Sequence, residues 1–126
     1  MSFPDLQIAI EHFGGLGIGE QTLTEELDLM KALAQHENLT IKLLDFGDMF
    51  EIPHSFWDVP DTVRDVVEVF GPEQIMWGCD YPLVSTREGY HHSLEFPLNY
   101  LSDLGDEDRD WIFGGIALRI WGFESD

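Results

Sequence analysis

Three short segments rich in apolar and β-branched residues, each followed by a polar loop and then by a helical pattern, organise this chain. They are residues 6–10, 39–44 and 74–77. Apolar runs of this length, bounded by turn residues, are typical of β-strands. The second run is interrupted only by Lys42, and the third carries no charge between Ile75 and Trp77. Strands that are apolar on both faces are typical of a parallel sheet covered by helices on both sides.

Helical periodicity fills the intervals between these strands. Residues 22–35 carry apolar side chains at a spacing near 3.6 residues, with Thr22 or Thr24 as the expected N-cap. Residues 60–70 place their valines and a phenylalanine on one face and stop at Gly71. Two further helical patterns are predicted at 91–104, where Pro97 should kink or divide the helix, and at 106–121, which Gly114 and Gly115 weaken.

The order of these elements predicts the fold class. Strand, helix, strand, helix, strand and further helices are the signature of right-handed βαβ units in an α/β protein with a parallel sheet. We find no linker or repeat, so residues 1–126 are expected to form a single domain. Three strands leave two sheet edges, and nothing in the sequence protects them.

Composition and charge exclude several classes of function. With 6 Lys+Arg against 25 Asp+Glu, the net charge is −19, so the chain lacks the cations that nucleic-acid binding needs. The content of 44% hydrophobic residues predicts a folded chain. No apolar run is long enough to span a membrane and no signal peptide is recognisable, so we expect a cytoplasmic protein. Cys79 is the sole cysteine, which rules out an internal disulfide and a cysteine-rich metal site.

Candidate chemistry lies directly after the apolar runs. The carboxyl ends of parallel strands share one edge, where ligands of α/β proteins bind. His12 follows the first strand and is either a packed, hydrogen-bonded histidine or a functional imidazole. Asp80 follows the third and either caps the next turn or pairs with a metal ion, a helix N-terminus or a cation. Asp45 and Asp48, after the second strand, are expected to be solvated.

Other candidates are weaker. His54, in the loop 49–59, and Arg87, the cation expected nearest this edge, are each a substrate contact or a solvated loop residue. No His-x-His or HExxH pattern exists, and the adjacent His91 and His92 cannot chelate one ion well. The glycine-rich run 14–19 suggests dinucleotide binding, but the third glycine of G-x-G-x-x-G is replaced by Glu20.

Four segments together resemble the amidohydrolase-related family of metal-dependent hydrolases, lactonases and decarboxylases. They are residues 3–6 (FPDL), 8–15 (IAIEHFGG), 70–82 (FGPEQIMWGCDYP) and 112–123 (IFGGIALRIWGF). The resemblance implies that the chain is the C-terminal part of a (β/α)8 barrel, comprising strands six to eight. It implies that Asp80 contacts a divalent metal, expected to be zinc, and handles a water or substrate proton. It also implies that His12 orients or polarises a small-molecule substrate.

The resemblance also implies an incomplete site. The family's His-x-His pair on strand one and its histidine on strand five have no counterpart here. The expected activity is hydrolysis or non-oxidative decarboxylation of a small carboxylated or cyclic compound, with a complementing N-terminal barrel portion or a second copy as possible partner. The alternatives are a non-catalytic α/β module that assembles with another chain and, third, a dinucleotide-binding domain.

Overall fold

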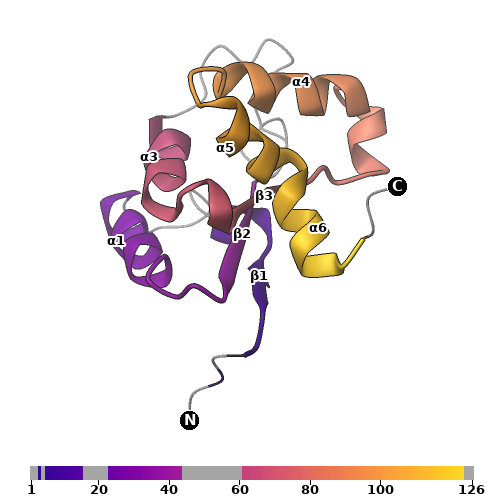
Figure 1. The fold of residues 1–126 in the computed structure, drawn as a ribbon. Helices are drawn as coiled ribbons and strands as arrows, with labels where there is room; N and C mark the ends of the chain where they lie inside the picture. The colour runs from indigo at the N-terminus through magenta and orange to yellow at the C-terminus, as the bar shows by residue number, and fades with distance from the viewer. Residues whose placement is uncertain (1–2, 4, 16–22, 44–60, 124–126) are drawn as a thin grey trace.

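The protein is built around a three-stranded parallel sheet, seen in a computed structural model that describes residues 3, 5–15, 23–43 and 61–123 (Figure 1). The strands are β1 (Ile8–Ile10), β2 (Leu39–Leu43) and β3 (Ile75–Trp77), in the order β1-β2-β3. All pairs are parallel, as predicted. β1 is shorter than the run 6–10, and the Leu6 amide, before the strand, donates to the Phe3 carbonyl at 3.2 Å.

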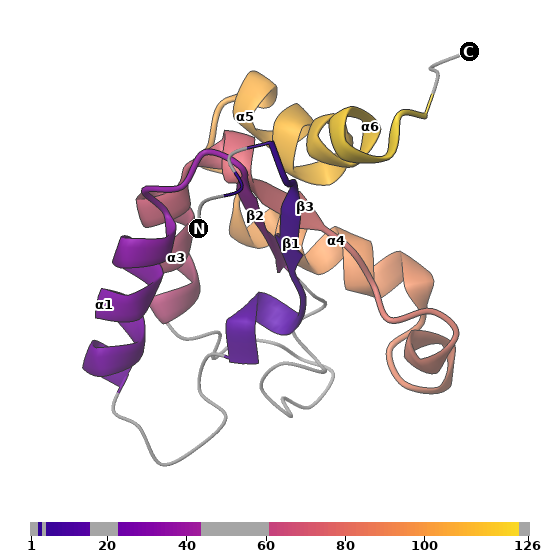
Figure 2. The same cartoon turned by 90° about the horizontal axis from the view of Figure 1, so that it is seen from below.

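Helices separate the strands as predicted. Figures 1 and 2 show α1 and α3 side by side next to the strands, and α5 and α6 following one another past β3. The described helices are α1 (Leu23–Leu33), α3 (Asp61–Phe70), α4 (Tyr90–Tyr100), α5 (Asp106–Asp110) and α6 (Ile116–Trp121), with the short helical turns η1 (His12–Gly15), η2 (Pro72–Gln74) and η3 (Leu83–Thr86) and the π-helical turn η4 (Trp111–Gly115). The α/β class and the sequence of βα units are therefore confirmed. Among these described helices, none combines the length and apolarity needed to cross a membrane.

Alternate residues of the strands form the core under α1 and α3. Ile41, Leu43 and Ile75 are fully buried and belong to the same cluster as Val63 and Val66 of α3. Complete burial of such a side chain contributes about 1.5–3 kcal/mol. The apolar face that the sequence pattern predicted for residues 60–70 is the face that α3 buries.

The intervening strand residues point to the opposite face of the sheet, because side chains alternate along a strand. Lys42 lies on this face, in register with Met76 of β3. Thr40 lies two residues earlier on the same face and is buried, as is Met76. In a closed barrel the face away from the helices lines the interior, and Lys42 of β2 is on that face.

The C-terminal helices depart from the prediction in two places. Pro97 does not divide the helix that contains it: α4 continues to Tyr100 and ends in a turn in which the Leu101 amide donates to the Pro97 carbonyl at 2.9 Å. A proline in the last turns removes one backbone hydrogen bond without stopping the helix. Further on, η4 interrupts the helical segment where a β-carbon on Gly115 would lie 2.7 Å from the Trp111 ring.

An arginine joins α3 to the end of α4. Arg64 donates to Asp103 Oδ2 at 2.7 Å and to the Tyr100 carbonyl at 2.8 Å, and its guanidinium lies 5.1 Å from the Tyr100 ring centroid. Burial raises the pKa of the Tyr100 hydroxyl, with the Arg64 charge acting against that rise. This contact fixes the helical layer that follows β3.

Candidate functional site

His12 and Asp80 follow the carboxyl ends of β1 and β3. Because the strands are parallel, both residues leave the sheet at the same edge. His12 lies two residues beyond Ile10 and is exposed, whereas Asp80 lies three residues beyond Trp77 and is partly buried. The topology thus delivers an imidazole and a carboxylate to one edge, and their chemical roles stay predictions.

The backbone that carries His12 is left-handed. His12 and Phe13 have φ values of 54° and 52°, and Gly14 and Gly15 continue with 70° and 73°. The Gly14 amide donates to the Glu11 carbonyl at 3.0 Å and closes the turn. For residues with a β-carbon this conformation costs roughly 1–2 kcal/mol each, so His12 and Phe13 are held in a strained turn.

Two contacts hold this turn in place. Phe13 is completely buried and belongs to the main core cluster. A β-carbon at Gly14 would lie 2.5 Å from Met30 Cε of α1, so the turn also packs closely on that helix. Packing on both sides therefore offsets the backbone strain and leaves His12 exposed to solvent after the carboxyl end of β1.

Asp80 does not cap the following turn through its side chain. Its carbonyl accepts the Val84 amide at 3.1 Å, while the N-cap residue of η3 is Pro82, which has no side-chain cap. No hydrogen bond of the Asp80 carboxylate to another described residue is present. The capping alternative is therefore wrong.

A third group meets this edge from β2. Lys42 Nζ lies 2.8 Å from Glu11 Oε2, and the lysine side chain is 20% exposed against 52% for the glutamate. A β-carbon at Gly78 would lie only 2.4 Å from Lys42 Cε, so the lysine stem passes directly over the glycine that follows β3. Sequence reasoning treated Lys42 only as an interruption of the strand, although a lone cation in an apolar run was the signal.

The other predicted contacts are engaged elsewhere or lie outside the described residues. Arg87 Nε lies 3.5 Å from Glu88 Oε2, a buried carboxylate next to it in the chain. The Arg87 guanidinium thus forms an ion pair with the adjacent Glu88 carboxylate. The remaining candidates lie outside the described residues: Asp45, Asp48, His54 and the glycines and glutamate at 17, 19 and 20.

The described residues offer the donor types that zinc accepts, but not their number. Imidazole nitrogen and carboxylate oxygen are both zinc ligands, and a catalytic site uses three protein ligands with one position open. Within the ranges that the structure describes, no group of three or more His, Cys, Asp and Glu side chains could hold a metal ion. His12 and Asp80 could therefore contribute to such a site without completing it.

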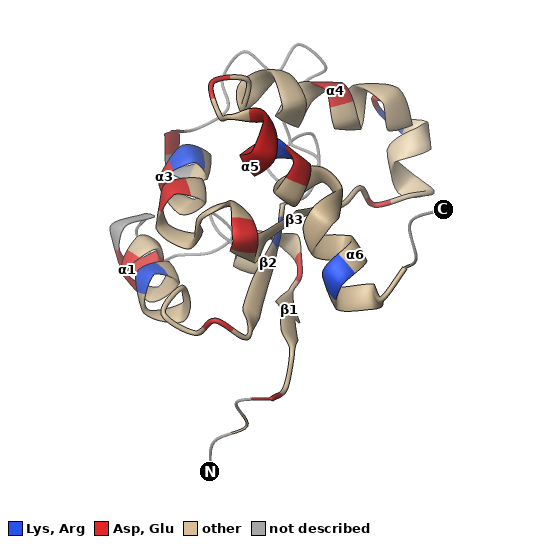
Figure 3. Ribbon diagram, in the orientation of Figure 1, with Lys and Arg blue, Asp and Glu red and all other residues tan. Residues whose placement is uncertain are grey.

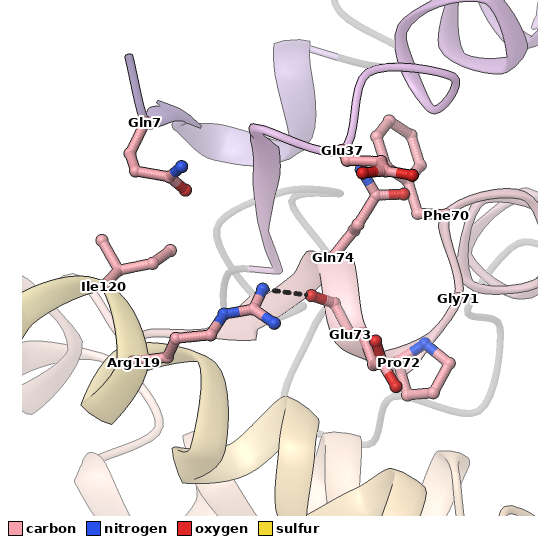
Figure 4. Close-up of a pocket in the computed structure, with 9 residues that line it drawn as sticks. All are labelled: Gln7, Glu37, Phe70, Gly71, Pro72, Glu73, Gln74, Arg119 and Ile120. Carbon is pink, nitrogen blue, oxygen red and sulfur yellow. Dashed lines mark hydrogen bonds between the residues drawn. The ribbon is translucent and has the colours of Figure 1, made fainter. Parts of the chain in front are cut away.

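A cavity lies at the opposite edge of the sheet (Figure 4). It has a volume of about 790 Å³, and Gln7 and Gln74, which immediately precede β1 and β3, line it. Arg119 of α6 crosses it to donate to the Glu73 carbonyl at 2.7 Å. Such amino-end positions stabilise parallel barrels rather than catalyse reactions, so we do not take this cavity as the reactive site.

Solved structures of amidohydrolases share this fold. An amidohydrolase from Burkholderia multivorans matches in a structure with bound HEPES (TM-score 0.73) and in another with bound zinc (TM-score 0.74). In both, the identity is 17%, and the match covers 94% of this chain and 45% of the solved chain. Amidohydrolase 2 from Bifidobacterium longum subsp. infantis matches with a TM-score of 0.67 and 22% identity, over 96% of this chain and 42% of the other.

The chain therefore spans less than half of each of these solved proteins, and its three βα units correspond to an arc of their barrels. A search of the curated proteins finds no match. The family model described as amidohydrolase matches residues 2–123, nearly the whole sequence. On this evidence the chain belongs to the amidohydrolase family.

Proposed function

We propose that this chain supplies part of the active site of a metal-dependent hydrolase or non-oxidative decarboxylase. Its substrate would be a small carboxylated or cyclic compound bound at the carboxyl edge of the sheet. The observation that carries the proposal is the placement of His12 and Asp80 after two strands of one parallel sheet. The carboxylate of Asp80 has no hydrogen-bond partner among the described residues, which supports a role toward a ligand.

Each residue has a role that its chemistry allows. A carboxylate accepts a proton from an attacking water or from a substrate hydroxyl, which is the role we propose for Asp80. An imidazole held at the same edge donates a hydrogen bond to a substrate oxygen and orients it, which is the role we propose for His12. A divalent metal, proposed to be zinc, would polarise the reacting bond or activate the water when bound.

The remaining ligands must come from outside the described residues. Three protein ligands are needed, and the described residues do not bring three together. Since the chain spans less than half of the solved amidohydrolases it matches, we propose that a complementing barrel portion provides them. The 126 residues alone are then expected to bind zinc weakly and to turn over little or no substrate.

Calorimetric titration with Zn²⁺ tests this proposal. Affinity should be low for the 126-residue chain and should rise when the complementing barrel portion is present. Asp80→Ala should remove most of that gain, whereas Asp5→Ala, which removes an exposed carboxylate before β1, should not. Tight zinc binding by the chain alone that persists in Asp80→Ala would contradict the proposal.

One observation favours assembly with another chain as a second candidate. Phe3, Leu6 and Ile8, in and before the edge strand β1, are 62%, 55% and 42% exposed. Apolar residues beside an open edge are typical of a surface that another chain covers. Sedimentation velocity distinguishes the cases: a stable homo-oligomer without zinc affinity would favour an assembly module, and a monomer that tightens zinc binding with its complement would favour the enzyme.

A further inference from the structure

We propose that the Lys42 ammonium, held beside Glu11 and over Gly78, binds the carboxylate of a small organic acid. This proposal deepens the proposed function. It rests on that function in one respect, because the acid is taken to be the substrate. The direction of the Lys42 side chain supports this proposal. Lys42 is in register with Met76, yet its Cε lies over Gly78, which is two residues beyond Met76 and directly follows β3. The lysine therefore runs along the inner face toward the carboxyl edge.

The neighbours of Lys42 leave room for its side chain and hold it in place. A β-carbon at position 78 would be 2.4 Å from Cε and 3.5 Å from Nζ, so any side chain there would displace the end of the lysine from its present position. Glu11 fixes the other side through the 2.8 Å contact to Nζ. Only 20% of the lysine side chain is exposed, so most of its stem is already packed before a ligand arrives, which lowers the entropic cost of binding.

The ammonium retains binding capacity. A lysine carries three N–H donors, and among the described residues its hydrogen bonding is limited to Glu11. Glu11 is 52% exposed, so its carboxylate can turn into solvent and yield its place. A substrate carboxylate is the chemical equivalent of the group it would displace. Glu11 then acts as an internal competitor that occupies the ammonium until an acid enters.

No other cation of the chain is placed in this way. All six Lys and Arg residues lie in the described ranges, and Lys42 is the one that belongs to a strand. The others contact carboxylates or carbonyls on helices and loops: Lys31 with Asp28, Arg64 with Asp103, Arg87 with Glu88, Arg109 with Asp106 and Arg119 with the Glu73 carbonyl. Figure 3 shows acidic residues gathered along the ribbon of α5 and spread over other elements. In a chain of net charge −19, an organic anion needs such a local cation.

Lysine-selective ¹³C labelling tests the proposal directly, because the chain holds two lysines and gives two Cε signals. The probe is sodium acetate, compared with sodium chloride at the same ionic strength. We expect a saturable shift of the Lys42 signal with acetate and none for Lys31. Equal shifts of both signals, or an unchanged Lys42 signal, would overturn the proposal.

Two pairs of variants sharpen the result. Glu11→Gln removes the competing charge and should tighten acetate binding at Lys42 by up to about fivefold, the equivalent of a partly exposed ion pair. Asp28→Asn, which frees Lys31 in the same way, should not make Lys31 respond. Gly78→Ala should weaken the Lys42 response, whereas Gly105→Ala, whose β-carbon meets nothing within 4 Å, should not. Weaker binding in Glu11→Gln, or a response of Lys31 in Asp28→Asn that equals that of Lys42, would overturn it.

The test is independent of catalysis. No metal is added and no turnover is measured, so an acetate-specific shift in a chain that never forms a zinc site would leave this inference standing and reject the proposed function. Conversely, Lys42→Met in an active assembled enzyme should raise KM for a carboxylated substrate more than it lowers kcat. An unchanged KM there would reject the role of Lys42 and leave the proposed function intact.

Discussion

The two edges of the sheet differ in how their polar groups are satisfied. At the amino edge, Gln74 donates from Nε2 to the His36 and Leu39 carbonyls, and Arg119 donates to the Glu73 carbonyl. At the carboxyl edge, His12 sits on a strained turn, and the Asp80 carboxylate has no hydrogen bond to a described residue. A cavity of about 790 Å³ lies at the amino edge. The cavity at the amino edge is therefore a structural junction, whereas the candidate site combines a strained turn with a carboxylate that no described residue bonds.

The largest expected effect concerns Phe13, the buried residue of the turn at the carboxyl edge. Phe13→Ala should lower the free energy of unfolding by about 3–5 kcal/mol, because Phe13 is fully buried and its removal leaves a cavity under the turn. Urea denaturation measures the loss. Phe123→Ala is the matched control, since Phe123 is 65% exposed, and it should stay within about 0.5 kcal/mol. Equal effects of the two variants would mean that the turn is not held by the core.

The amino edge should respond through stability without affecting the anion site. Gln74→Ala removes two hydrogen bonds to backbone carbonyls and should cost about 1–3 kcal/mol. Gln7→Ala, an exposed residue of the same cavity, should change the free energy of unfolding by less than about 0.5 kcal/mol. In both variants the Lys42 response to acetate should remain. Loss of that response in folded Gln74→Ala would erase the distinction between the edges.

The smallest expected effect is a stabilisation. His12→Gly should raise the free energy of unfolding by up to about 1 kcal/mol, because glycine adopts a φ of 54° without the β-carbon penalty. His91→Gly, an exposed histidine in α4, should instead destabilise by about 0.5 kcal/mol through lower helix propensity. Thermal unfolding of both variants provides the comparison. A destabilised His12→Gly would show that the imidazole has a structural role, which is the alternative that the sequence left open.

The predicted elements that proved accurate share a local cause. The valines of α3 and its stop at Gly71 follow from side-chain periodicity and a glycine whose φ is 73°. The Gly71 amide closes the helix by donating to the Val67 carbonyl at 2.9 Å. The strands were found because their apolar runs had to be buried. These features depend on neighbours within a few residues, so the chain order reveals them.

The candidate site was predictable only in part. His12 and Asp80 were found because residues that follow parallel strands must share an edge. The left-handed turn could not be predicted, because nothing about a histidine followed by a phenylalanine favours a positive φ. Lys42 was missed as a site residue because its direction depends on the register with Met76 and on the absence of a side chain at Gly78.

The amino-acid sequence by itself determined the alternation of strands and helices, the parallel order and the acidic surface. These features follow from hydrophobic periodicity, turn residues and charge, which are properties of the local sequence. Only the tertiary structure decided which polar groups remain available. Lys42 and Glu11 are 31 residues apart, and their 2.8 Å contact exists because hydrogen bonds between β1 and β2 set one register. A shift of that register by a single residue would turn the lysine to the helix-covered face.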